Sequence, residues 1–392
     1  MRVFRLVVSA AGALRRFARG RVVLCVSALC ALASMAAVPP DAAYIGYFDV
    51  RTLACLFCIL AVVQALRGAG ALDGAARALV TRFRTPRAAV LALVGATVCL
   101  SMVATNDMAL VMMLPLATAT LARAGWTRLV PLVFTLQSLG ANLGGMIVPF
   151  GNPQNLYLFS YYSLGVGEFV RVMALPFAVS MALVFAVASL APLHGLEARP
   201  GSPAPVDSAN IARGKVAAYL ALLGLVVAAV FGAVSPLAVL AVVAAVLALA
   251  DRSALRRVDF ALLLTFCCFF VFSGNLARVP EVSSALVSLM ESWGLVVSAG
   301  LSQVVSNVPA AVLLSHFTDA WQPLLVGVNI GGAGTVVGSL ASLITLQHFL
   351  SMRRLPSARD AQGVGTGRFL AVFMGANLAF FVVLLAVCVP LY

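Results

Sequence analysis

Polar side chains that could bind an ion or a small anion lie in short stretches of an otherwise apolar chain. One stretch, "LGANLGGMIVPFGNPQNL" (139–156), begins and ends like a membrane helix, but its middle is rich in glycine, proline and asparagine. A helix broken inside a bilayer leaves backbone groups without partners, so such breaks persist only where protein, water or a ligand supplies them. Free N–H groups at a broken helix favour anions, whereas carbonyl and asparagine oxygens can hold Na⁺.

This stretch has a counterpart in the second half of the chain. "ANLGGMIVPFGNPQNL" (141–156) aligns with "VNIGGAGTVVGSLASL" (328–343) at a constant offset of 187 residues. The alignment pairs Asn142 with Asn329, Gly144 and Gly145 with Gly331 and Gly332, Gly151 with Gly338, Asn152 with Ser339, Asn155 with Ser342, and Leu156 with Leu343. Packing of small residues between helices would explain the glycines, but it does not explain the asparagines. Paired breaks in two repeats are typical of a transporter's binding site near the bilayer midplane.

A polar turn precedes each broken segment. "TND" (105–107) lies in the middle of the apolar region 88–123, and "SNVP" (306–309) lies in the middle of 283–317. Each region fits a re-entrant helical hairpin that enters and leaves the bilayer on one side. We expect the two tips and the two breaks to form one site for a substrate or an ion. Its candidate residues are Thr105, Asn106, Asp107, Asn142, Gly145, Gly151, Asn152, Asn155, Ser306, Asn307, Asn329, Gly332, Gly338, Ser339 and Ser342.

The composition places the chain in a bilayer. Of the 392 residues, 62% are hydrophobic and only 10% are charged, and the mean hydropathy is +1.06. A membrane helix needs about 20 apolar residues, and the chain offers many such runs, so we expect an all-α polytopic membrane protein. The net charge of +13 does not indicate a nucleic-acid-binding protein, because the basic residues lie in short loops between apolar runs.

The basic residues also predict the orientation. The expected crossings are 22–38, 51–66, 129–159, 169–193, 216–234, 236–250, 260–276, 321–345 and 369–391. With these nine crossings and a cytoplasmic N-terminus, 23 of the 26 lysines and arginines are cytoplasmic, as the positive-inside rule expects. Only Arg51, Arg171 and Arg278 fall outside. Removal of the first span as a signal peptide, or hairpins that cross fully, are weaker alternatives.

This layout divides the chain into four parts. Residues 1–21 form a basic cytoplasmic N-terminus, 22–193 the first transmembrane repeat, 194–235 a linker with a connecting helix, and 236–392 the second repeat. The connecting helix makes the second repeat start on the opposite side of the membrane. The result is a pair of inverted-topology repeats, each with a re-entrant hairpin and an interrupted helix, and a C-terminus outside the cell. Secondary transporters commonly have this plan.

Four motifs resemble those of the ion transporter superfamily, whose branches include arsenite permeases, NhaD-type sodium–proton antiporters, and citrate or divalent-anion symporters. They are "TNDMALVMMLPL" (105–116), "GANLGGMIVPFGNPQN" (140–155), "SQVVSNVPAAVLLS" (302–315) and "NIGGAGTVVGS" (329–339), and the resemblance extends over residues 20–392.

The resemblance implies an elevator-like or rocking transporter in which both hairpin tips meet at the substrate, and it makes Asn106 and Asn307 site residues. In the dicarboxylate branch both tips carry Ser-Asn-Thr. The first tip here, Thr105-Asn106-Asp107, is closer to the arsenite and sodium–proton branches. At the second tip, Ser306 departs from the sodium–proton branch, which typically has Asp before the Asn.

Asp107 is the only one of the thirteen acidic residues deep in a predicted membrane region, and no lysine or arginine lies there. A carboxylate at that depth costs about 2.5–3.5 kcal/mol on insertion scales, which makes it a functional candidate. Asp107 could instead only cap the second hairpin arm. Without a buried arginine, helix dipoles, amides and hydroxyls would hold an anion. A proton on Asp107, or Na⁺ near Asn106, Asp107 and Asn307, would offset its charge.

These features predict a secondary active transporter that moves a small anion, either a carboxylate such as citrate or a dicarboxylate, or an oxyanion. We expect symport with H⁺ or Na⁺ across a bacterial inner membrane. A sodium–proton antiporter is the alternative. A polytopic membrane enzyme is less favoured, because no catalytic cluster such as HExxH or Ser/His/Asp lies at membrane depth.

The expected partners are the small anion and the lipid bilayer, with no nucleic acid. No cofactor is expected apart from Na⁺ as a candidate coupling ion. No Walker motif indicates direct use of ATP. A homodimer, and an arsenite pump subunit with a separate ATPase, are alternatives that the sequence leaves open.

Overall fold

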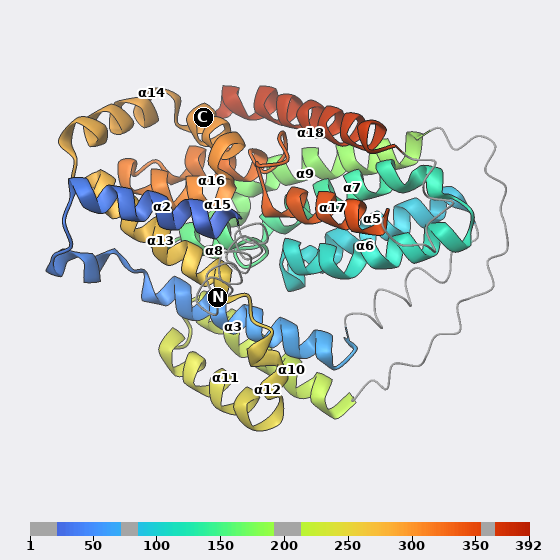
Figure 1. Cartoon of the computed structure of the whole chain (residues 1–392), viewed down its shortest axis with the longest axis horizontal. Helices are drawn as coiled ribbons and strands as arrows, with labels where there is room; N and C mark the ends of the chain where they lie inside the picture. The colour runs from blue at the N-terminus through green and yellow to red at the C-terminus, as the bar shows by residue number, and fades with distance from the viewer. Residues whose placement is uncertain (1–21, 72–84, 192–212, 354–364) are drawn as a thin grey trace, which may run out of the picture.

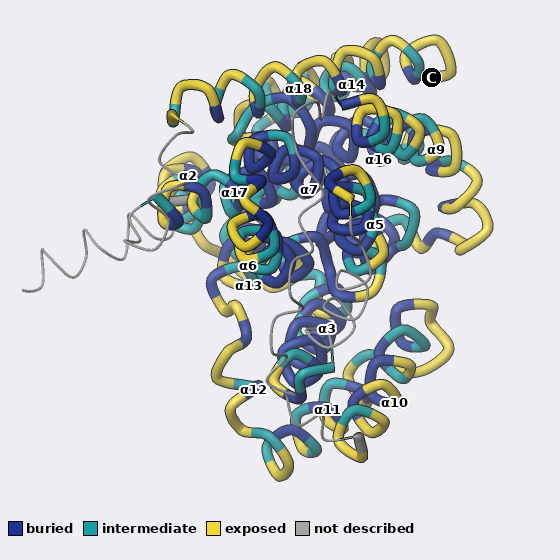
Figure 2. Tube along the Cα trace, turned by 90° about the vertical axis from the view of Figure 1, so that its right-hand side faces the viewer, coloured by how far each residue is buried: buried dark blue, intermediate teal, exposed yellow. Residues whose placement is uncertain are grey.

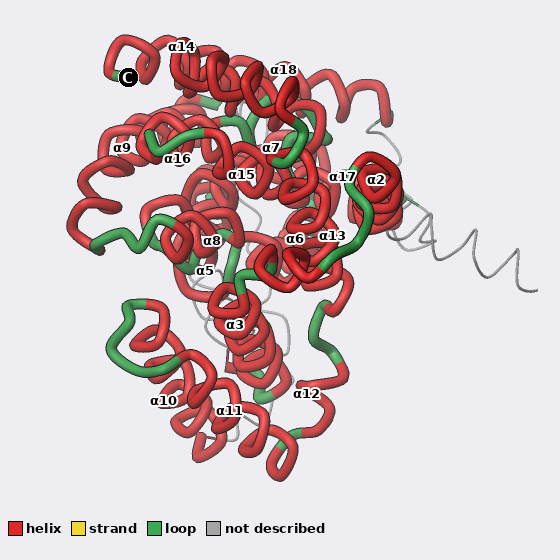
Figure 3. The backbone as a smooth tube through the Cα atoms, turned by 90° about the vertical axis from the view of Figure 1, so that its left-hand side faces the viewer, coloured by secondary structure: helices red, strands yellow, loops and turns green. Residues whose placement is uncertain are grey.

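The computed structural model describes residues 22–71, 85–191, 213–353 and 365–392, and these residues form helices joined by short loops, with no strand among them (Figures 1 and 3). The all-α prediction is therefore confirmed. The predicted N-terminal segment 1–21, and residues 194–212 of the predicted part 194–235, lie outside the described residues.

The first half of the chain contains one helical pair followed by a broken helix. Its elements are α2 (Val22–Ala37), η1 (Ala42–Tyr47), α3 (Val50–Gly68), α5 (Pro86–Ala104), α6 (Asn106–Arg123), η2 (Thr127–Leu129), α7 (Val130–Gly144), η3 (Gly145–Ile147), α8 (Pro153–Tyr161) and α9 (Val166–Leu190). The pair α5–α6 turns at Thr105, and the helix that starts as α7 resumes as α8.

The second half repeats this order. Its elements are α10 (Arg213–Val230), α11 (Pro236–Ala250), α12 (Arg252–Arg256), α13 (Phe260–Ala277), α14 (Pro280–Val305), α15 (Asn307–Leu314), η4 (Ser315–Phe317), α16 (Trp321–Ile330), α17 (Leu340–Met352), α18 (Thr366–Cys388) and η6 (Val389–Leu391). The pair α14–α15 turns at Ser306, and α16 resumes as α17 after a break.

Seven helices among the described residues are long and apolar enough to cross a membrane, and shorter apolar helices of 10–17 residues accompany them. The chain is thus an integral membrane protein. Two of the seven, α5 and α14, are arms of the helical pairs, and four of the predicted crossings correspond to shorter helices or helix fragments. The layout with nine crossings therefore stays a prediction.

The core forms around α7, whose residues are almost all buried (Figure 2). This helix packs against both arms of the first pair, α5 and α6, and against α9 and α18. In contrast, α10, α11 and α18 expose apolar residues such as Leu249 and Val382. Outward apolar faces of this kind suit a helix that contacts lipid tails.

The first arms of the two helical pairs differ in regularity. The first arm, α5, starts regularly, because Pro86 suits the first helical turn and the Thr85 side chain accepts from the backbone N–H of Ala88 at 3.2 Å. The arm α14 is kinked at Trp293, which has φ −140° and ψ 31°. The sequence analysis did not predict this kink, although Ser292 precedes Trp293 and Gly294 follows it, residue types that commonly occur at kinks.

An ion pair ties η1 to the end of α13. Arg278 lies 2.7 Å from Asp41 and also donates to the hydroxyl of Tyr47 at 3.0 Å. The ring of Tyr47 covers Gly274 so closely that a Cβ there would lie 2.6 Å from it. The Arg278 guanidinium holds the pKa of Asp41 below its usual value. Arg278, one of three basic residues predicted outside, is thus paired with an acid.

Candidate functional site

The two turns, which we call the tips, have the same unusual backbone. Thr105 has φ 67° and ψ 152°, and Ser306 has φ 77° and ψ 155°. Positive φ is costly for a residue with a side chain, so the surrounding structure must enforce it. The sequence analysis placed both tips at these residues but did not predict their conformation.

Each tip is hydrogen-bonded to the broken helix of its own half. The N–H of Asn106 donates to the carbonyl of Gly151 at 3.2 Å, and the N–H of Asn307 donates to the carbonyl of Gly338 at 3.0 Å. These two glycines are the ones that the sequence alignment pairs. The same contact therefore occurs once in each half, which brings each tip to one break.

The first break is stabilised by the asparagines that follow it. Asn152 donates from Nδ2 to the carbonyl of Asn142 at 3.1 Å. Asn155 donates to the carbonyls of Met146 and Val148 at 3.2 and 3.4 Å. Carbonyls that lose their helical partners at a break need such donors when they are buried. These asparagines thus have a structural role in the break, whether or not they also contact a ligand.

Asn329, from the second half, joins the two breaks. Its Oδ1 accepts from Asn152 at 3.4 Å and from Gln154 at 3.2 Å, and its Nδ2 donates to Oδ1 of Asn155 at 2.6 Å. Gln154 was not among the predicted site residues. A glutamine in a strongly apolar chain was the signal that could have revealed it.

The first tip belongs to the same network, because Asn106 donates to Oδ1 of Asn142 at 3.4 Å. The second break lacks equivalent amides. There, Ser339 caps α17, its hydroxyl accepting from the N–H of Ser342 at 3.3 Å. The carbonyls of this break contact Gln303 of α14 instead. Gln303 is a second residue that the sequence analysis missed.

The glycines of the two breaks are surrounded by protein atoms. A Cβ on Gly145 would lie 2.6 Å from Oδ1 of Asn152. A Cβ on Gly151 would collide with the carbonyl oxygen of Gly145, and one on Gly332 would collide with the side chain of Asn142. Packing of small residues between helices was one explanation for these glycines in the sequence. In the structure, Gly145 and Gly151 let the first break fold closely on itself, and Gly332 lets the second break approach Asn142 of the first.

Four buried polar atoms in this region have no hydrogen-bond partner among the described residues. They are Oδ1 of Asp107, Oδ1 of Asn152, Oε1 of Gln154 and Nδ2 of Asn307. A buried group of this kind in a folded protein calls for an ion, a ligand or water. Three of the four atoms are acceptors, which suits a cation or a protonated group.

Asp107 stands apart from the amide network. The residue is half-buried in the first turn of α6, and its N–H is bonded to the side chain of Asn106 at 2.9 Å. Its carboxylate accepts no capping hydrogen bond from the described part of α6. No lysine or arginine is hydrogen-bonded to a tip or a break within the described residues.

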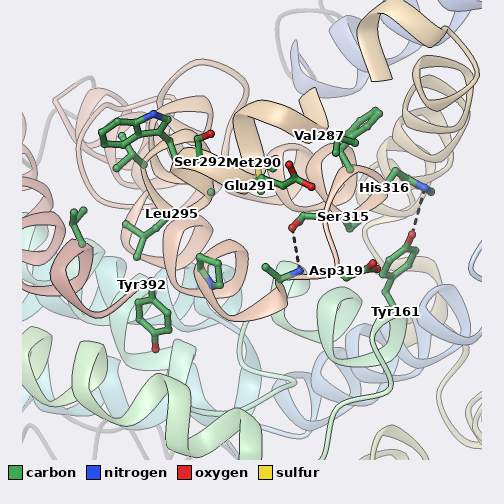
Figure 4. A pocket seen from close by; sticks show the side chains of 18 residues that line it. Tyr161, Val287, Met290, Glu291, Ser292, Leu295, Ser315, His316, Asp319 and Tyr392 are labelled. Carbon is green, nitrogen blue, oxygen red and sulfur yellow. Dashed lines mark hydrogen bonds between the residues drawn. The ribbon is translucent and has the colours of Figure 1, made fainter. Parts of the chain in front are cut away.

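A cavity of about 730 Å³ lies elsewhere, beside the kink of α14 (Figure 4). Its wall includes Glu291, Trp293, His316, Asp319 and Tyr392. None of the predicted site residues lines it, as far as the described residues form its wall. The polar tips and breaks, rather than this cavity, are therefore the candidate functional site.

Comparison with known proteins identifies the family. The model of the citrate transporter family matches residues 13–325. The chain belongs to the citrate transporter family. Among similar proteins, the uncharacterized transporter MJ0456 of Methanocaldococcus jannaschii is 31% identical over 301 residues, which cover 76% of this chain and 80% of that protein. The inner membrane protein YbiR of Escherichia coli K12 is 32% identical over 303 residues, with coverage of 76% and 80%.

Membership of the citrate transporter family confirms the resemblance to the ion transporter superfamily. It also excludes the membrane enzyme that the sequence analysis kept as its least favoured alternative. The matched residues include both tips and the first break, whereas Asn329 and the second break lie just beyond the match.

Proposed function

We propose that this member of the citrate transporter family is a secondary transporter that moves a small anion by symport with H⁺ or Na⁺. Its site is formed by the two tips and the two helix breaks. The observation that carries this proposal is the repeated contact of each tip with the paired glycine carbonyl, Asn106 with Gly151 and Asn307 with Gly338. Near these contacts, buried polar atoms have no hydrogen-bond partner among the described residues.

Two inverted repeats with re-entrant hairpins account best for this arrangement. Each half has a helical pair, a broken helix and a long final helix in the same order. The tip residues Thr105 and Ser306 share a backbone conformation that few residues adopt. A tip in the interior of the bilayer, at the level of both breaks, is what alternating access around a midplane site needs.

Contacts between loops support the predicted orientation. Asp41 and Arg278, both predicted outside, form an ion pair at 2.7 Å. Arg87 and the carbonyl of Ala191, both predicted at the cytoplasmic side, approach within 3.5 Å. These contacts agree with the predicted layout, in which 23 of the 26 basic residues are cytoplasmic. The layout has a cytoplasmic N-terminus and an external C-terminus. The name of the relative YbiR favours an inner membrane location.

The family description favours a carboxylate such as citrate as the anion. Since no basic side chain is bonded to the site in the described residues, amides, hydroxyls and helix N-termini would bind it. A co-transported cation would balance its charge. Na⁺ near Asn106, Asp107 and Asn307, or a proton on Asp107, would serve, because Oδ1 of Asp107 is an unpartnered acceptor. The unpartnered Nδ2 of Asn307 is a donor and would instead bind the anion.

A sodium–proton antiporter is the second candidate. The free Oδ1 of Asp107 favours it, because one carboxylate could bind H⁺ and Na⁺ in turn. Ser306 at the second tip offers no second carboxylate. Asp107 alone would then exchange both ions.

Uptake into proteoliposomes tests the proposal. Labelled citrate, a dicarboxylate and arsenite would be offered with an imposed proton gradient, a sodium gradient or neither. Accumulation of one anion that needs one of the gradients is the expected result. Sodium-driven proton movement without any anion would instead establish the antiporter.

A further inference from the structure

Gln303 lies in α14, one turn before the tip at Ser306, and its side chain reaches the second break. Its Nε2 donates to the carbonyls of Gly331 and Ala333 at 2.7 and 3.0 Å. The same nitrogen lies 3.1 Å from the carbonyl of Ala299, in its own helix. Three carbonyl oxygens thus surround one amide nitrogen.

The acceptor of the same side chain is also used. Oε1 of Gln303 accepts from the N–H of Thr335 at 2.8 Å, and its backbone carbonyl accepts from the Thr335 hydroxyl at 2.9 Å. Gly334 makes room for this arrangement. It has φ +112°, and a Cβ on it would collide with Oε1 of Gln303. The loop of the second break is therefore shaped around the Gln303 side chain.

In the first half, other side chains donate to the carbonyls of the break. Counting back from the tips, the position that matches Gln303 is Met102, since both lie three residues before the tip residue. Methionine has no amide, and the carbonyls of the first break accept from Asn152 and Asn155 instead. The two halves thus have matching tips and breaks but different donors at the breaks.

Three carbonyls directed at one point are a favourable environment for a cation, because backbone carbonyls can replace the hydration shell of an ion. An amide nitrogen carries partial positive charge and supplies two hydrogens. We propose that the Gln303 amide takes the place of a bound monovalent cation at the second break. Gln303 is then a positioning residue that keeps this break folded without an ion.

The location of the coupling cation follows from this, and that step rests on the proposed function. If the second break needs no ion, the coupling cation binds on the side of the first tip, where Asp107 and Asn152 have unpartnered oxygens. The claim about the second break itself does not depend on which anion is carried, or on whether the chain is a symporter.

The test is the melting temperature of the full-length protein in detergent, in NaCl, KCl or choline chloride at equal ionic strength. For Gln303→Ala, we expect a lower melting temperature in choline and a recovery in Na⁺ or K⁺ that exceeds any shift of the wild type. Met102→Ala, the matched control, should show only the wild-type response to the cations.

A second variant covers the case in which Gln303→Ala does not fold. Gln303→Glu keeps the acceptor for Thr335 and replaces the donor by an oxygen, so its melting temperature should also depend on Na⁺ or K⁺. The inference is wrong if every variant that folds responds to cations as the wild type does. Because these measurements need no substrate, a failure to find a transported anion would leave their outcome unaffected.

Discussion

Gly332 approaches Asn142 so closely that a Cβ on the glycine would collide with the asparagine side chain, although the two residues belong to opposite halves of the chain. We predict that Gly332→Ala lowers the free energy of unfolding by about 1–3 kcal/mol, the usual effect of overpacking. Thermal or denaturant melts would measure it. Gly300 in α14 is the control, because a Cβ there meets nothing within 4 Å. Equal destabilisation by Gly300→Ala would show that the contact with Asn142 is not the cause.

Asn329 belongs to the second half of the chain and is hydrogen-bonded to residues that follow the first break. Replacing it by leucine leaves the amide groups of Gln154 and Asn155 without their partner. An unsatisfied buried polar group costs about 1–3 kcal/mol, so we expect Asn329→Leu to lower both stability and transport. Asn377→Leu is the control, because this equally buried asparagine donates to the carbonyl of Phe373 in its own helix and to no other described residue. Transport that survives Asn329→Leu unchanged would show that the link between the breaks is dispensable.

The strained backbone of the two tip residues should lower stability, while their hydroxyls should be needed for transport. Glycine adopts the backbone conformation of Thr105 and Ser306 without strain, whereas other residues lose about 1–3 kcal/mol there. Thr105→Gly and Ser306→Gly should therefore raise the melting temperature. Transport should fall, because the hydroxyls at the site are lost.

Ser163, with φ 50°, is the matched control in a loop away from the tips. Ser163→Gly should stabilise the protein and leave uptake unchanged. If Thr105→Gly and Ser306→Gly both transport at the wild-type rate, the tip hydroxyls do not contact the substrate.

Asp107→Asn separates the two candidate functions. In a proton-coupled symporter, burial favours the protonated carboxyl, and the asparagine mimics that form. Anion binding should then persist and lose its dependence on pH, while proton-driven accumulation stops. In a sodium–proton antiporter, the same change should abolish Na⁺ binding and exchange. Binding by calorimetry and uptake in proteoliposomes measure these effects.

The control for this prediction is Glu168→Gln, which alters a carboxylate that accepts from the N–H of Gly165 at the start of α9. It should affect stability only. If Asp107→Asn also lowers stability alone, with coupled transport intact, Asp107 has no role in coupling.

The sequence predicted the helical pairs and the breaks well, because their signals are local. Thr105 and Ser306 interrupt apolar runs, and glycine with proline or serine marks the breaks that end at Pro153 and Leu340. The matching offset of Asn142 and Asn329 also indicated that the breaks are related. In the structure they are joined through Asn152, and each tip contacts its own break.

Other features depend on contacts between distant residues, so the local pattern does not reveal their partners. Gln303 bonds to carbonyls 28 and 30 residues away, and Gln154 bonds to Asn329 across the two halves. The kink at Trp293 does have local markers, because Glu291 and Ser292 precede it and Gly294 follows it, but the sequence analysis did not use them. Neither glutamine belongs to the repeat-related positions, so the alignment of the halves could not reveal them.

The bonds around Asn329 have a consequence for biosynthesis. Gln154 leaves the ribosome 175 residues before Asn329 does, an interval of about 9–35 s at about 5–20 residues per second. During this interval the bonds of Asn152 to Asn142 and of Asn155 to Met146 can form within the nascent first half. The hydrogen bond from Gln154 to Asn329 can form only after the second half has been synthesised and has entered the membrane. A ribosome stalled between the two residues would therefore hold the chain with its first break closed and Gln154 still unpaired.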